Sequence, residues 1–342
     1  MNKAEVLPRF GQVSNPLRKL RIAVWHNLPG GGGKRALYDH VRGLIERGHT
    51  VESWCPPTAD QTYLPLKELI LEHVVPARRR ERNSNYSLSS LLALRTHGLN
   101  SVIEIDGYAR QCAEEINRGS FDLLFANSSA EIAVSSIGRY VNLPKILYLQ
   151  EPSRFLYEAE PHLPWMALPR RAWTPAHLAA MLHNAVRLRG HRIQLREEWL
   201  NARAFDRILV NSLYSRESVQ RAYGLDASVC YLGVDNQKFV DRHLPKEEFI
   251  VGLGSISPRK NIGFVIDALA RVCAPRPKLI WVGNVVVPEY LAELKLAAQA
   301  GQVDFEPQML IDDDALINLL NRARLMVYAP KLEPFGFAPL FH

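Results

Sequence analysis

The sequence predicts an α/β protein of two domains, each a parallel sheet covered by helices. The chain has 342 residues, more than one hydrophobic core usually holds. Apolar segments of strand length alternate with segments of helical periodicity along most of the chain, which favours parallel sheets with helices on both faces. A polar stretch without periodicity, 236–248, then divides the pattern into two series.

The bulk composition indicates a folded, soluble protein. The chain is 47% hydrophobic and 23% charged, which excludes a disordered or collagen-like chain. Its net charge of +7 favours anionic partners such as nucleotide phosphates or anionic lipid. The 4 cysteines show no C-x-x-C spacing, so neither a disulfide framework nor a zinc site is expected. This cysteine usage fits a reducing setting, so we expect a cytoplasmic protein, and the N-terminus lacks the apolar core of a signal peptide.

The first series follows a loose tail at residues 1–19 and defines a domain at 20–240. Ser212 is expected to cap one of its helices, and Gly224 to end that helix. We expect a helical pair between Pro164 and Asn201. The remaining elements are strands at 20–26, 49–56, 121–127, 145–150, 206–212 and 230–235, with helices after residue 33 and at 105–118 and 131–140.

The second series defines a partial domain at 241–342 that resembles a nucleotide-binding fold. Its strands are expected at 248–256, 277–284, 303–309 and 324–330, and its helices at 260–272, 288–301 and 312–323. The sequence ends soon after the last strand, so we expect this domain to be incomplete.

Three loops carry residues suited to binding a phosphate or a sugar. Gly30–Gly33 lies between a strand and a helix, where absent side chains let a phosphate or sugar approach backbone amides. It lacks the P-loop spacing, and a plain surface turn remains the alternative. Arg259 and Lys260 follow a strand and precede a helix, where two cations would neutralise a diphosphate. Glu333 follows the last strand, and its carboxylate could accept hydrogen bonds from sugar hydroxyls.

The second domain resembles the retaining family-4 glycosyltransferases of GT-B fold, in which two Rossmann-like domains face a cleft. The resemblance rests on GSISPRKN, WVGN, DDDALINLLNRA and EPFGFAPL, in the family's order, and is specific mainly between Gly252 and Leu340. It implies transfer of a hexose from a nucleotide-diphosphate sugar, with retention, to a saccharide or lipid-linked acceptor. No cofactor, bound metal or nucleic-acid partner is expected.

The same resemblance assigns roles to individual residues. Arg259 and Lys260 would bind the donor diphosphate, and Glu333 would hold the donor sugar as the third catalytic residue. The backbone of the loop after Glu333 would bind the sugar, and the first domain would approach it through its glycine loop and Gln150. The substrate-binding residues expected on this basis are Gly31, Gly32, Gln150, Phe335, Gly336, Phe337 and Ala338.

Two positions depart from the family pattern. The family has a second glutamate eight residues after the first, where this chain has Phe341, so we expect a truncated protein. Gln150 stands where several relatives carry a histidine, and glutamine can hydrogen-bond but cannot carry a proton. Glu151 and Arg154, directly after it, fit an acceptor contact and a surface ion pair equally well.

Other functions remain open from the sequence. The missing glutamate and final helices suit a non-catalytic remnant or a nucleotide-sugar-binding protein. An epimerase of related fold is a third alternative, although the sequence shows no convincing acid and base pair. The arginine clusters PARRRERN and VRLRGHRIQLREEW suit either peripheral contact with the inner face of a membrane or plain solvated surfaces. The donor base, the sugar, the acceptor and the oligomeric state are not fixed.

Overall fold

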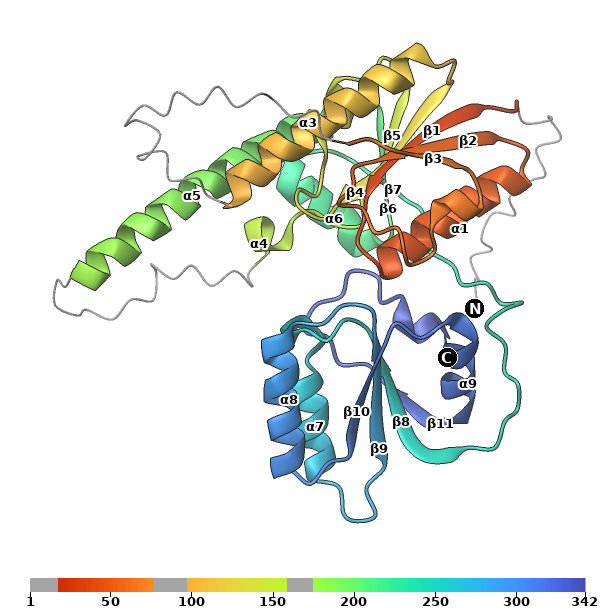
Figure 1. Cartoon of the computed structure of the whole chain (residues 1–342), viewed down its shortest axis with the longest axis vertical. Helices are drawn as coiled ribbons and strands as arrows, with labels where there is room; N and C mark the ends of the chain where they lie inside the picture. Colours follow the sequence, from red (N-terminus) through yellow and green to blue (C-terminus); the bar gives the residue numbers. More distant parts are fainter. Residues whose placement is uncertain (1–17, 77–96, 159–174, 342) are drawn as a thin grey trace, which may run out of the picture.

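The protein contains two separate parallel sheets, as the sequence predicts (Figure 1). The structure is a computed structural model that describes residues 18–76, 97–158 and 175–341. A seven-stranded sheet in the order β3-β2-β1-β4-β5-β6-β7 forms the first domain, and a four-stranded sheet in the order β10-β9-β8-β11 forms the second. Every paired strand runs parallel to its neighbour.

The first sheet is built around β1, which lies between β2 and β4. Ala23 and Trp25 of β1 point into one core and Ile22 and Val24 into another, so alternate residues of the strand serve the two faces of the sheet. The strands are β1 (Arg21–Asn27), β2 (Thr50–Cys55), β3 (Leu71–Val74), β4 (Leu123–Ser129), β5 (Lys145–Tyr148), β6 (Arg207–Val210) and β7 (Ser228–Val229).

Helices cover both faces of this sheet. On one side, Leu37 and Val41 of α1 (Gly32–Glu46) pack with Ile22 and Val24. The opposite core takes its helical residues from α3 (His97–Arg118), α5 (Pro175–Ala202) and α6 (Leu213–Tyr223). A single turn, α4 (Arg154–Tyr157), follows β5. In the described parts of the chain, no helix is both long enough and apolar enough to cross a membrane.

The second sheet has the same layered arrangement on a smaller scale. Figure 1 shows α7 (Ile262–Ala270) and α8 (Pro288–Ala300) on one side of the sheet and α9 (Asp313–Arg322) on the other. Two cores, one on each side, fill the spaces between sheet and helices. The strands are β8 (Glu247–Leu253), β9 (Lys278–Gly283), β10 (Phe305–Met309) and β11 (Ala323–Val327), which agree with the predicted series.

The caps of α6 confirm a local prediction. The Ser212 hydroxyl accepts a hydrogen bond from the Ser215 backbone amide at 3.0 Å, so it satisfies one of the free amides of the first turn. Gly224 ends the helix in a left-handed conformation with φ of 64°.

Two other predictions for the first domain were wrong. Residues 131–140 form only a short 3₁₀ helix, Ser136–Arg139, because α5 supplies their hydrogen bonds: Glu198 accepts from the Ala133 amide at 3.1 Å and Asn201 donates to the Val134 carbonyl at 2.9 Å. Residues 230–235 do not form the expected strand; the nearest strand is the two-residue β7, which ends before this segment begins. The helical pair expected between Pro164 and Asn201 stays a prediction, because 159–174 lie outside the described residues; the described part of that segment forms one helix, α5.

Candidate functional site

The topology of each sheet creates one position where loops can bind a ligand. In an open parallel sheet, ligands bind beyond the carboxyl ends of two neighbouring strands whose connections leave in opposite directions. In the first sheet these strands are β1 and β4, and in the second they are β8 and β11. The predicted loops Gly30–Gly33, Arg259–Lys260 and Glu333–Ala338 follow β1, β8 and β11 respectively.

The structure brings Lys260 and Glu333 into contact. The Lys260 ammonium donates a hydrogen bond to a Glu333 carboxylate oxygen, although the two residues are 73 positions apart. Their side chains are 22% and 24% exposed, so this ion pair lies at the surface of the loop cluster and not in a core. A cation and a carboxylate therefore stand side by side at the predicted edge.

Arg259 lies beside this pair with an exposed side chain. Within the described residues, its guanidinium forms no ion pair, while its backbone carbonyl accepts a hydrogen bond from the Lys331 amide at 3.3 Å. Arg259 and Lys260 form a 3₁₀ turn, Pro258–Lys260, which leads directly into α7. The amino end of α7 adds a positive dipole at the same place, which suits an anion.

The loop after Glu333 is shaped by a glycine and two phenylalanines. Gly336 has φ of 76°, and a Cβ atom there would lie 3.1 Å from the Tyr328 hydroxyl, so a larger residue would be both strained and crowded. The rings of Phe335 and Phe337 lie 6.2 Å apart. Ala338 begins the short 3₁₀ helix Ala338–Phe341.

The first domain approaches this loop through its glycine loop. A Cβ atom on Gly32 would lie 3.6 Å from the Phe337 ring, so Gly32 and Phe337 face each other across the two domains. Gly31, with φ of 142°, borders open space. The Gln150 side chain packs against Gly33, and its amide nitrogen is buried without a hydrogen-bond partner among the described residues.

Glu151 and Arg154 form an ion pair that also joins the two domains. The Arg154 Nε atom donates to Glu151 at 2.5 Å, and its Nη1 atom donates to the Leu332 carbonyl at 2.8 Å. Burial raises the pKa of Glu151, against the opposing charges of Arg154 and Arg259. The surface ion pair left open by the sequence is therefore an interdomain contact beside Glu333.

A second interdomain contact joins α1 to α9. Arg35 forms a bidentate ion pair with Asp313, and both side chains are nearly buried, at 9% and 14% exposure. Arg35 also donates to the Tyr63 hydroxyl at 2.7 Å. Burial alone would raise the pKa of Asp313, but hydrogen bonds from Arg35 and Lys238 lower it overall.

The sequence did not reveal the interdomain roles of Arg154, Arg35 and Asp313. Arg35 lies two residues after the glycine loop, and Asp313 occupies the first turn of a helix, which are the only local signals these two residues carry. Their pairing joins positions 278 residues apart, and no spacing rule predicts such a contact.

One cavity of the second domain lies apart from these loops. It has a volume of about 310 Å³ and borders the linker, α9 and the chain end through residues such as Phe239, Ile317 and Leu340. None of the predicted site residues lines it. The strand ends, and not this cavity, therefore define the candidate site.

The chain is similar to known proteins in part of its sequence and in its fold. Residues 234–340 match the family model described as glycosyl transferases group 1. No curated protein matches the chain in sequence.

Solved structures match nearly the whole chain. The Anabaena protein HepE, in complex with UDP and glucose, is 18% identical, with a TM-score of 0.61 over 93% of this chain and 77% of that one. A glycosyltransferase from Rickettsia africae is 15% identical, with a TM-score of 0.56 over 93% and 74% of the two chains. WaaG, a glycosyltransferase involved in lipopolysaccharide biosynthesis, is 13% identical, with a TM-score of 0.56 over 94% and 77%. At these identities the likeness shows a shared GT-B fold.

Proposed function

We infer the reaction of this chain from one premise: it is a glycosyltransferase of GT-B fold, and its residues 234–340 belong to the glycosyl transferases group 1 family. We propose that it transfers a hexose from a nucleotide-diphosphate sugar to a saccharide or lipid-linked acceptor, with retention at the anomeric carbon. The donor would bind the loops after β8 and β11, and the acceptor would approach from the first domain.

One observation carries this proposal: Lys260 and Glu333 meet beside the exposed guanidinium of Arg259, which forms no ion pair with any described residue. A nucleotide-diphosphate sugar needs cations at its diphosphate and hydrogen-bond acceptors at its sugar, and the three side chains supply both within one loop cluster. The neighbour HepE is in complex with UDP and glucose, which supports the same class of donor for the shared fold.

The proposed chemistry needs positioning and charge stabilisation more than a nucleophile. The bond between the anomeric carbon and the diphosphate oxygen breaks, and a bond to the acceptor oxygen forms on the same face of the sugar. The acceptor's hydroxyl proton passes to the departing diphosphate, so the products are the glycoside and the nucleoside diphosphate. Arg259 and Lys260 would stabilise the negative charge that develops on the leaving group, and Glu333 would hold the sugar hydroxyls.

The first domain offers support for a membrane-associated acceptor. On α5, Arg189, Arg192 and Arg196 are exposed at helical spacing, and Trp199 beyond them is 43% exposed. Arginines beside an exposed tryptophan suit the headgroup region of an anionic bilayer. We propose that this face of α5 holds the enzyme at the cytoplasmic side of a membrane that carries the acceptor.

Vesicle flotation tests the membrane proposal. Vesicles with anionic lipid should bind the chain, zwitterionic vesicles should not, and the triple variant R189E/R192E/R196E should lose the binding. Equal binding of the variant, or no binding of the native chain, would contradict it. The matched control is R216E/R221E on α6, which changes two exposed arginines of the same domain.

Titration calorimetry tests the donor proposal with the full chain. UDP, GDP and ADP, followed by their common sugar derivatives, are titrated into the protein after circular dichroism has shown that it is folded. We expect one nucleotide to bind with a micromolar dissociation constant and its sugar derivative to release that nucleotide when an acceptor is added. A folded sample that binds none of them would overturn the proposal and favour a non-catalytic remnant, whereas release of an epimerised sugar would favour an epimerase.

A further inference from the structure

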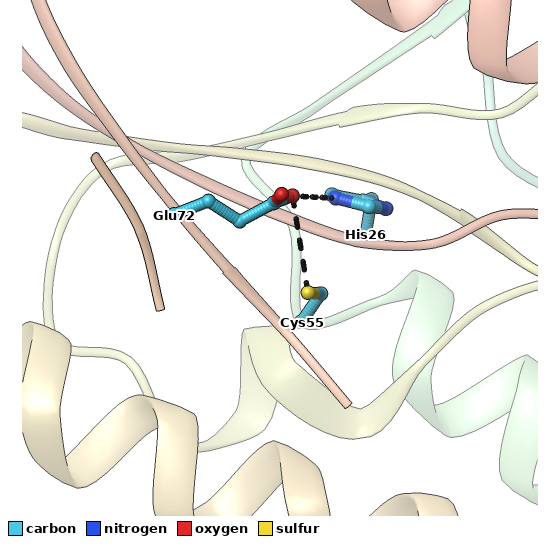
Figure 2. Close-up of side chains that lie close together, drawn as sticks. All are labelled: His26, Cys55 and Glu72. Atoms are coloured by element: carbon cyan, nitrogen blue, oxygen red, sulfur yellow. Dashed lines mark hydrogen bonds and ion pairs between the residues drawn. The ribbon is translucent and has the colours of Figure 1, made fainter. Parts of the chain in front are cut away.

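Three side chains that can bind a metal ion meet at one edge of the first sheet. His26 lies near the end of β1, Cys55 ends β2, and Glu72 lies on β3, so the three come from adjacent strands. Figure 2 shows the Glu72 carboxylate between the His26 ring and the Cys55 sulfur. His26 Nε2 lies 3.0 Å from Glu72 Oε1, Cys55 Sγ lies 3.9 Å from the same oxygen, and the candidate ligand atoms all lie within 4.8 Å of one another.

Buried polar atoms around this cluster lack partners. The second carboxylate oxygen of Glu72, Nδ1 of His26 and the ammonium of Lys34 are all buried without a hydrogen bond to any described residue. His26, Lys34 and Cys55 are 0% exposed. Buried polar atoms are nearly always paired, and a charged one left unpaired is costly. The cluster therefore has polar atoms that a further bound group could coordinate or hydrogen-bond.

The neighbours of the cluster suit a bound metal ion. Gln61 donates a hydrogen bond to the Cys55 sulfur at 3.3 Å. Residues around a metal site commonly hydrogen-bond to the ligands in this way and orient them. Lys34 is the competing cation, and it interacts electrostatically with Cys55, Glu72 and Asp60. With a divalent ion bound, the thiolate and two carboxylates would carry three negative charges against the three positive charges of the ion and Lys34.

We propose that His26, Cys55 and Glu72 form a metal site for Zn²⁺. One nitrogen, one sulfur and one oxygen ligand suit this borderline-soft ion, and three protein ligands leave a fourth position for water. Binding releases one proton from the Cys55 thiol to solvent and changes no oxidation state.

The site would act on the glycine loop. Asp60, which faces Lys34, also lies against that loop, since its carboxylate oxygen is 2.8 Å from the place of a Cβ atom on Gly30. A metal ion joining residues of three adjacent strands would stiffen the base from which Gly31 and Gly32 reach the second domain. This role is independent of the donor chemistry proposed above, because none of the three ligands belongs to the donor loops.

The experiment measures metal directly in the untagged full chain. Cys230 and Cys273 are exposed, so both are replaced by serine in every variant, and in a second sample of the otherwise native chain, to remove adventitious thiol ligands. Zinc content is measured by plasma mass spectrometry after growth with zinc, and affinity by competition with a chromophoric chelator. Co²⁺ is then loaded into the metal-free chain to detect the ultraviolet charge-transfer absorption of a cobalt-thiolate bond.

We expect about one zinc per chain and a cobalt-thiolate band. C55S should abolish the band and weaken zinc binding by more than about 100-fold, and Q61A should weaken it by about 10-fold to 100-fold. C112S is the matched control, because Cys112 is also a buried free thiol of this domain but lies outside the ligand cluster, and it should retain both signals.

Three results would overturn the metal site. They are a native chain without zinc after growth with zinc and reloading, a cobalt spectrum without the thiolate band, and zinc binding by C55S equal to that of C112S. H26A and E72Q, checked for native circular dichroism, provide the same comparison if C55S does not fold. The native chain's own zinc content remains decisive in every case.

Discussion

The two sheets differ in what lies at their carboxyl edges. In the second domain the polar groups are accessible: Arg259 is exposed, and the Lys260 and Glu333 side chains are 22% and 24% exposed. In the first domain the corresponding edge is closed, with His26 and Lys34 fully buried. The edge of the second sheet can therefore receive a charged ligand from solvent. The polar groups at the edge of the first sheet instead interact with one another in the interior.

The same difference explains which edge the sequence could describe. The proposed donor site at the edge of the second sheet consists of residues that lie within two short motifs, 252–261 and 333–340. The edge of the first domain uses His26, Cys55 and Glu72, which meet only because β1, β2 and β3 are neighbours in the sheet. A site made of short motifs can be predicted from sequence, whereas a buried cluster such as this one forms only through the order of the strands in the sheet.

The largest expected effect is on nucleotide binding at the proposed donor site of the second domain. Replacing both cations, R259A/K260A, should weaken nucleoside-diphosphate binding at least about 100-fold, because each charge-assisted hydrogen bond contributes about 1.5–3 kcal/mol. The exposed pair R271A/K295A in the same domain is the control and should bind normally. Calorimetric dissociation constants measure the effect. Equal affinity of the two double variants would place the diphosphate elsewhere.

The next effect is on the contact between the domains. R35A removes the bidentate ion pair of a nearly buried Asp313 and leaves it with Lys238 alone; losing two charge-assisted hydrogen bonds should cost about 3 kcal/mol of interdomain stability. R42A, on the same helix, removes an ion pair to Asp235 from a side chain that is 37% exposed and should cost less than about 1 kcal/mol. Urea unfolding, with solution scattering to follow separation of the domains, compares them. Similar losses of unfolding free energy in R35A and R42A would show that the Arg35–Asp313 ion pair does not hold the domains together.

A smaller effect is expected on sugar recognition. E333Q keeps the shape of the side chain but removes the charge that strengthens hydrogen bonds to sugar hydroxyls, so the sugar nucleotide should bind about 10-fold more weakly. The free nucleoside diphosphate should bind as before, because it lacks the sugar. E293Q, an exposed substitution on α8, is the control. A loss for the free nucleotide equal to that for the sugar nucleotide would contradict the assigned role.

The smallest effect concerns pH and the buried carboxyl of Glu198. Burial raises the pKa of Glu198, although Ser153, Gln194, Ala133 and Tyr223 all hydrogen-bond to it. A raised folded-state pKa means that the folded chain binds this proton more tightly than the unfolded chain, so stability from this group rises as pH falls and is lost as pH rises through the folded pKa.

The pH prediction is measured by urea unfolding of E198Q and the native chain at several pH values. As pH falls from 7 toward the ordinary glutamate value of about 4.3, the native chain should gain stability relative to E198Q. E197Q, the neighbouring substitution on α5, should follow the native chain. A difference between native and E198Q that is constant with pH would show that Glu198 keeps the same pKa on folding.

Most of the fold could be predicted from the sequence, because strand and helix periods are local. All strands of the second domain and the caps of α6 agree with prediction. The segment 131–140 could not be predicted, since its amides and carbonyls bond to Glu198 and Asn201 of a helix more than 60 residues away. The meeting of Lys260 with Glu333 followed from topology once both were placed after neighbouring strands, whereas Arg154 on Leu332 and Arg35 on Asp313 depend on how the domains face each other.

A crystal structure of the chain with the nucleotide that calorimetry selects would test the central claim most directly. The account predicts the diphosphate within hydrogen-bonding distance of Arg259 and Lys260, with the glycine loop at Gly31 and Gly32 facing it from the first domain. A sugar derivative should place its hydroxyls on Glu333. A nucleotide bound away from the ends of β8 and β11, or against the buried edge of the first sheet, would contradict the assignment of the donor site.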